Sequence, residues 1–113
     1  MTPQTLIDQL NTPPETLTFA DVIATIDNHY DYTPQAFSNG ELENAAGTNE
    51  GSCKVFSFAQ LNGLTEAQTL ALFAEHYRSV LATPEGSDHG NIRNFMKTGW
   101  AGVRFSGAAL KQP

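Results

Sequence analysis

The sequence predicts an α+β fold: a single domain in which a small, mainly antiparallel sheet carries about four packed helices. Three observations lead to this prediction. The length of 113 residues suits one domain. Helix-type and strand-type apolar patterns both occur, and they do not alternate strictly as they do in α/β proteins. The composition, with 40% hydrophobic residues, is that of a globular protein.

Two helices are predicted in the N-terminal third of the chain. Thr2 and Pro3 suit the N-cap and the first position of a short helix, which ends before the proline-rich connector at residues 12–14. Thr18 and Asp21 approximate the capping box of a second helix. We expect the core to contain the apolar face of this second helix, which consists of Phe19, Val22, Ile23, Ile26 and Tyr30.

The middle of the chain is predicted to form strands. The Asn-Gly pair at residues 39–40 is typical of a type I′ hairpin turn, with strands at residues 35–38 and 41–45. Apolar residues on both alternating faces of residues 53–61 predict a strand that is covered on both sides. Residues 47–51 lack the phosphate-loop pattern and are expected to precede a strand, so a tight turn is the preferred interpretation.

One long helix is predicted after residue 65. Thr65 and Gln68 form a capping box at its start, and the sequence TPEG at residues 83–86 stops it. The helical spacing predicts a buried stripe that consists of Leu70, Phe73, Ala74, Tyr77 and Leu81.

A short helix and a strand complete the predicted fold. The helix runs from about residue 89 to residue 98, with Ser87 or Asp88 as its N-cap and Gly99 at its end. Its packed residues are expected to be Ile92, Phe95 and Met96. Residues 100–105 then form the last strand.

Charge and composition restrict the class of partner. Twelve acidic residues outnumber six basic ones, which gives a net charge of −6. Such a surface repels phosphate backbones, so we expect no nucleic-acid partner. No apolar stretch approaches the roughly 18 residues of a membrane span. The first ten residues also lack the features of a Sec signal peptide.

Several motifs together resemble those of one known family. The longest are DYTP at residues 31–34, NEGSCKVF at residues 49–56 and DHGNIRNF at residues 88–95. Shorter matches occur at Phe37, Asn39-Gly40, Tyr77-Arg78 and Gly99-Trp100. These motifs are similar to those of the HopJ type III effector family of small bacterial proteins. The likeness covers nearly the whole chain, and it implies a single HopJ-like domain over residues 1–113.

The resemblance implies no settled biochemical activity. The family takes its name from a plant-pathogen effector, and similar proteins also occur in free-living bacteria. A single cysteine fits a reducing compartment, so we expect a cytoplasmic protein. The alternative is secretion by a type III system, with the N-terminal segment, rich in Thr, Gln and Pro, as the export signal.

Cys53 and His89 are the candidate catalytic residues. A thiol nucleophile needs a lowered pKa, which a nearby cation, imidazole or helix N-terminus can supply. His89 can supply the imidazole if the last helix meets the start of the strand at residues 53–61, with Asp88 or Glu50 orienting the ring. The apolar neighbours of Cys53 favour a buried packing role instead, and we prefer that interpretation.

A polar cluster of Asn49, Glu50, His89, Asn91 and Arg93 is the candidate ligand-binding site. Three of these residues lie on the short helix and two lie in the turn before the strand at residues 53–61. If the last strand pairs with that strand, the cluster gathers at one end of the sheet. We predict that it lines the best concavity of the protein and binds an unknown small molecule or protein. In the alternative, the cluster is self-paired, with Arg93 holding a carboxylate, and pins the helix to the sheet.

No metal site and no cofactor are predicted. The three histidines, His29, His76 and His89, do not have the spacing of metal ligands on one element. Two function classes therefore remain. We favour a small non-catalytic binding or interaction module, and the alternative is a small enzyme built from residues 49–53, His89 and Arg93. A concave pocket in which these side chains converge would support the enzyme.

Overall fold

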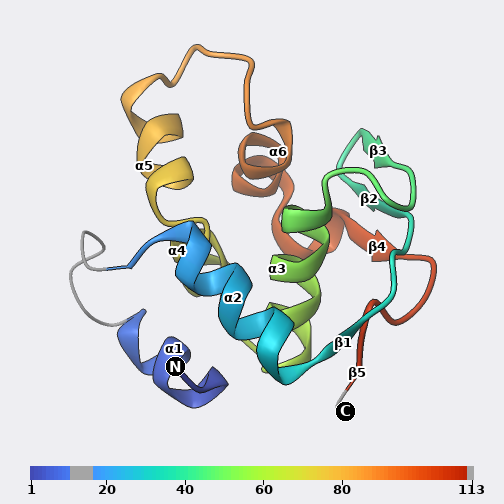
Figure 1. The fold of residues 1–113 in the computed structure, drawn as a ribbon. Coiled ribbons are helices and arrows are strands. Elements are labelled where there is room, and N and C mark those ends of the chain that lie inside the picture. The colour runs from blue at the N-terminus through green and yellow to red at the C-terminus, as the bar shows by residue number, and fades with distance from the viewer. Residues whose placement is uncertain (11–16, 112–113) are drawn as a thin grey trace.

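Helix α3 (Glu50–Leu61) is at the centre of the fold, and the other elements pack around it (Figure 1). The structure is a computed structural model, and it describes residues 1–10 and 17–111. The buried residues of α3 are Cys53, Val55, Phe56, Ser57, Phe58 and Ala59. A helix that is apolar on nearly all sides is stable only when other elements cover it.

This central helix shows that the strand predicted at residues 53–61 is wrong. A short apolar run that is buried on every side has no periodicity that separates a strand from a helix. The expectation that residues 47–51 precede a strand is wrong for the same reason, because they lead into α3. The last strand therefore has a different neighbour from the one expected.

The described residues form six α-helices, one 3₁₀ helix and five short strands. The remaining α-helices are α1 (Pro3–Gln9), α2 (Phe19–His29), α4 (Glu66–Ala71), α5 (Glu75–Ala82) and α6 (Gly90–Thr98). The strands and the 3₁₀ helix are β1 (Asp31–Tyr32), β2 (Phe37–Asn39), β3 (Leu42–Asn44), η2 (Gly99–Gly102), β4 (Val103–Phe105) and β5 (Leu110–Lys111). Within this part of the chain, none of the helices has the length and apolar character that crossing a bilayer requires.

The N-terminal helices begin as predicted. The side chain of Thr2 caps α1, and the side chain of Thr18 caps α2 by accepting a hydrogen bond from the backbone N–H of Asp21. Leu6 of α1 is fully buried, so this helix is docked on the domain. The connector predicted at residues 12–14 lies outside the described residues.

The strands form two small antiparallel sheets, which confirms the α+β class. The larger sheet has the strand order β3-β2-β4, and β1 pairs with β5 in the smaller one. The predicted hairpin is present as β2 and β3, and Gly40 in its turn has a φ of +63°, which glycine adopts without strain. Helix α6 packs against β2 and β3.

The long helix predicted after residue 65 is two helices, so that prediction is wrong. Thr65 and Gln68 do form the predicted capping box, but it starts the short helix α4. The chain then turns at Ala74, whose φ of +52° is strained for a residue with a Cβ atom. The local sequence carries no signal for this turn, because contacts elsewhere in the fold must hold a residue in such a conformation.

The turn changes which side chains of the predicted stripe are buried. Phe73 is buried and Tyr77 is half-buried, whereas Leu81 is 53% exposed. The predicted burial of Leu81 is therefore wrong. The turn also places His76 in the first turn of α5, next to the ring of Phe19 at a centroid distance of 4.8 Å.

The last helix and strand differ from the prediction at their boundaries. His89, and not Ser87 or Asp88, is the N-cap of α6. Phe95 is buried as predicted, but Met96 is 44% exposed, so its predicted packing is wrong. Residues 99–102 form η2, which shortens the last strand to β4, and β4 pairs with β2.

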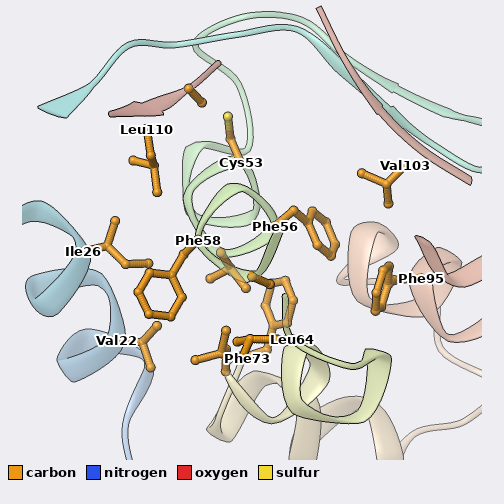
Figure 2. Packing of buried hydrophobic residues seen from close by; sticks show 14 of the residues in the cluster. Val22, Ile26, Cys53, Phe56, Phe58, Leu64, Phe73, Phe95, Val103 and Leu110 are labelled. Atoms are coloured by element: carbon orange, nitrogen blue, oxygen red, sulfur yellow. The ribbon is translucent and has the colours of Figure 1, made fainter. Parts of the chain in front are cut away.

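The core is a cluster of aromatic and aliphatic side chains around α3. Figure 2 shows Phe58 directed toward Ile26 of α2 and Phe56 directed toward Phe95 of α6. The ring of Phe56 lies 5.0 Å from that of Phe95 and 5.5 Å from that of Phe73, measured between centroids. Burial of each such side chain contributes about 1.5 to 3 kcal/mol. The two aromatic side chains of α3 thus join α2, the turn between α4 and α5, and α6 into one core.

Candidate functional site

A polar cavity lies where the N-terminal ends of α3 and α6 meet the start of α5. Its volume is about 240 Å³, and its lining residues are Asn49, Ser52, Phe73, His76, His89, Gly90, Asn91 and Ile92. We call it the α3–α6 pocket. Pockets for drug-sized ligands measure roughly 300 to 1,000 Å³. The α3–α6 pocket therefore suits a small molecule, or one end of a larger one.

Both helices that open onto the pocket start from a residue in the left-handed conformation. Asn49 precedes α3 with a φ of +48°, and His89 precedes α6 with a φ of +51°. Neither side chain caps the helix that follows it. The side chains of Thr2, Thr18 and Thr65, by contrast, cap α1, α2 and α4. The helix ends at the pocket therefore keep backbone N–H groups that no side chain has capped, and these ends carry partial positive charge.

Two histidines come together in the pocket. The ring centroids of His76 and His89 are 5.0 Å apart. His89 is one of the site residues that the sequence predicts, whereas nothing in the sequence marks His76 as a site residue. His76 reaches the pocket because the chain turns at Ala74, before the start of α5. The sequence carries no local signal for this turn, so it could not identify His76 as a site residue.

Four asparagines fix the wall of the pocket on the side of the larger sheet. Asn91 of α6 and Asn44 of β3 donate to each other's side-chain oxygens, at 3.0 and 3.2 Å. Asn49 donates to the same oxygen of Asn44 at 2.6 Å, and Asn39 of β2 donates to the backbone carbonyl of Asn91 at 2.7 Å. Buried amides are costly unless they are bonded. This network therefore holds both helix ends and the hairpin in one geometry.

The structure separates Glu50 and Arg93 from the other predicted site residues. The hydroxyl of Tyr32 donates a hydrogen bond to Glu50 at 3.3 Å. Arg93 donates to Asp88 and to Thr83, in the connection between α5 and α6. These contacts stand in place of a Glu50–Arg93 pair. Asn49, His89 and Asn91 line the pocket, and Glu50 and Arg93 do not.

Cys53 lies in the core. Its side chain belongs to the hydrophobic cluster shown in Figure 2 and is 1% exposed. Its Sγ atom is 3.8 Å from the carbonyl oxygen of Gln35. Burial raises the pKa of the thiol, against the smaller lowering effects of its contacts with the backbone of Gln35 and with Tyr32. A raised pKa is the opposite of what a thiol nucleophile needs. His89 is not among the described contacts of Cys53, so the geometry favours the packing role.

Other cavities are less suited to a polar ligand. The largest described one, about 380 Å³, lies between α5 and α6 and is lined by Val80, Leu81, Pro84, Gly86, Arg93, Met96 and Lys97. Size alone would favour it, but its walls are mainly apolar. Its charged side chains are Lys97 and Arg93, and Arg93 is already bonded to Asp88 and Thr83. Ligand sites combine a cavity with convergent polar groups, so we place the candidate site at the α3–α6 pocket. Across residues 1–10 and 17–111, no set of three or more His, Cys, Asp or Glu side chains is arranged to hold a metal ion.

Comparisons with known proteins identify relatives but no activity. The model of the family described as HopJ type III effector protein matches residues 3–110. No curated protein matches the sequence. The crystal structure of unknown function protein VPA0580 is 48% identical and has a TM-score of 0.93, over 97% of this chain and 92% of that chain.

Proposed function

The chain belongs to the HopJ type III effector protein family, and from this premise we propose that it is a small, non-catalytic binding module. Its ligand is a small anionic molecule, or the anionic end of a larger one, and it binds in the α3–α6 pocket. The observation that carries this proposal is the convergence of polar groups from three separate segments on one cavity.

Several groups that line the pocket can donate hydrogen bonds. Ser52 supplies a hydroxyl, and His76 and His89 supply imidazole nitrogens. The uncapped ends of α3 and α6 add backbone N–H groups and partial positive charge. Donors of this kind match a carboxylate or phosphate group.

The charge distribution supports an anion over a cation. The chain carries a net charge of −6, yet the lining of the pocket contains no acidic side chain. Glu50 is next to the pocket in sequence, but its carboxylate is directed to Tyr32. The carboxylate of Asp88 lies 3.8 Å from Nε2 of His89, but it is paired with Arg93 and is not part of the lining. A cation would therefore find no free carboxylate in the lining to neutralise it.

Binding without catalysis is the better-supported class. An activated serine or cysteine needs a base within hydrogen-bond reach. Among the described residues, no hydrogen bond joins Ser52 to His76 or to His89. Cys53 is buried on α3 with Gln35 as its neighbour. A covalent mechanism therefore has a candidate nucleophile but no base in contact with it.

The place of action is a separate part of the proposal. We propose that the protein binds its ligand in the bacterial cytoplasm, and export by a type III system is the alternative that the family name suggests. Leu6 is fully buried, so use of the N-terminal segment as an export signal requires α1 to leave the domain. A translocation reporter fused behind the chain, compared in strains with and without a type III system, tests export directly.

A thermal-shift screen tests the proposed function. The probes are inorganic phosphate, succinate and, as a neutral control, glycerol, all at one ionic strength. A ligand at 100 times its Kd stabilises the native state by about 2.7 kcal/mol. We expect the anions, and not glycerol, to raise the Tm. The double variant His76→Leu/His89→Leu should lose the shift, and Lys111→Ala, on the exposed surface of β5, should keep it. Equal shifts in the wild type and the double variant would place the anion elsewhere.

A further inference from the structure

Arg93 makes four hydrogen bonds, all of them to the two ends of one loop. Its Nε donates to the backbone carbonyl of Asp88 at 2.6 Å, and one terminal nitrogen donates to the carboxylate of Asp88 at 2.7 Å. The other terminal nitrogen donates to the carbonyl of Thr83 at 2.8 Å. The nitrogen that binds Asp88 also donates to the hydroxyl of Thr83 at 3.1 Å. We call residues 83–88 the α5–α6 loop. Most of the donors of Arg93 are thus used within the protein.

The α5–α6 loop closes tightly over the guanidinium group. The side chain of Arg93 is 12% exposed, although Asp88 is 60% exposed. A Cβ atom added at Gly86 would lie 2.6 Å from a terminal nitrogen of Arg93. The loop therefore wraps around Arg93, and glycine is the residue that permits this approach.

His89 follows this loop directly and depends on it for its position. Its φ of +51° is disfavoured for a residue with a Cβ atom. The surrounding structure must therefore hold it. Asp88 reaches both neighbours: one carboxylate oxygen bonds to Arg93, and the other lies 3.8 Å from Nε2 of His89. A continuous set of contacts thus runs from Arg93 through Asp88 to the ring of His89 in the pocket.

We propose that Arg93 is a positioning residue of the α3–α6 pocket, which fixes His89 through Asp88 and the α5–α6 loop and does not touch the ligand. This inference rests on the proposed function for its role in binding, but its structural part is independent of any ligand. It gives Arg93 a role that differs from the ligand contact expected from the sequence.

The test is an NMR comparison of wild type with Arg93→Gln and Asp88→Asn. The matched control is Arg104→Gln, because Arg104 is exposed on β4. The first readout, measured without ligand, is the chemical shifts of the His89 ring protons together with the contact between the His89 and His76 rings. The second is the affinity for inorganic phosphate. We expect Arg93→Gln to change the His89 signals. We also expect it to weaken phosphate binding about tenfold, which corresponds to the loss of one hydrogen bond between the displaced His89 ring and the charged phosphate.

Each outcome separates the positioning role from the alternatives. Unchanged His89 signals in folded Arg93→Gln overturn the proposal, even if phosphate binding weakens, because Arg93 would then contact the ligand itself. If Arg93→Gln does not fold, Asp88→Asn decides by the same readouts, since its exposed side chain can be changed without a core defect. If wild type binds no phosphate, the proposed function loses support, and the His89 signals alone decide the role of Arg93. Altered His89 signals in the control Arg104→Gln would show that the change is not specific to Arg93, and this result would also count against the proposal.

Discussion

The imidazole rings of His76 and His89 lie 5.0 Å apart although they belong to different helices. His76 is in the first turn of α5, and His89 is the N-cap of α6. Each ring depends on a residue in the left-handed region, Ala74 in one case and His89 itself in the other. Strained backbone of this kind clusters at functional sites, where the rest of the fold maintains it. The pair therefore supports the α3–α6 pocket as the candidate site.

Phe73 should be essential for the stability of the core. Its ring is buried against those of Phe56 and Phe19, so Phe73→Ala leaves a large cavity. We expect a loss of about 3 to 5 kcal/mol in the free energy of unfolding, measured by urea denaturation. Leu81→Ala is the matched control, and because Leu81 is half exposed it should cost less than about 1 kcal/mol. Similar losses for the two variants would show that Leu81 is as buried as Phe73, which would contradict the turn at Ala74.

Asn91 should be required for the asparagine network. Asn91→Ala removes three side-chain hydrogen bonds, two with Asn44 and one with Asn39, although Asn39 keeps its bond to the backbone carbonyl of residue 91. A hydrogen bond of this kind contributes about 0.5 to 1.5 kcal/mol. We expect a total loss of at least about 2 kcal/mol in the free energy of unfolding. Asn28→Ala, on the exposed face of α2, should stay within about 0.5 kcal/mol of wild type. A loss of that small size for Asn91→Ala would show that the network is not formed.

Cys53 should react slowly with thiol reagents in the native state. It should also make the free energy of unfolding fall at alkaline pH. Burial raises the pKa of the folded thiol above that of the unfolded chain, so the folded state prefers the neutral thiol. This contribution is fully present below about pH 8.5 and is lost as the pH rises toward the folded pKa. Urea denaturation between pH 8 and 10 should show wild type losing stability relative to Cys53→Ala. Native-state labelling as fast as that of a free thiol peptide would refute the burial.

The caps and the hairpin were predictable from the sequence because their signals are local. Thr2, Thr18 and Thr65 act through backbone groups within three residues, and Gly40 acts through its own φ. The identity of α3 was not predictable in this way. Its apolar residues are buried on every side, so neither helical nor strand periodicity survives in residues 53–59.

The candidate site was predictable only in part, for a related reason. Asn49, His89 and Asn91 come from two motifs that the fold brings to one pocket, and those motifs stand out in the sequence. His76 joins them only because the chain turns at Ala74, and Arg93 leaves them because Asp88 and Thr83 hold it. The first outcome depends on a strained backbone residue, and the second depends on a loop that brings Asp88 and Thr83 back to Arg93. Propensity and spacing do not encode such contacts.

An NMR titration of backbone amides with inorganic phosphate and, separately, with succinate tests anion binding in the α3–α6 pocket most directly. Sodium chloride at matched ionic strength is the control for screening. Binding should produce saturable shift changes that are largest at the amides of residues 50–52 and 90–92, the first turns of α3 and α6. If neither anion gives saturable changes there, or if chloride reproduces them, the α3–α6 pocket is not the anion site proposed for this protein.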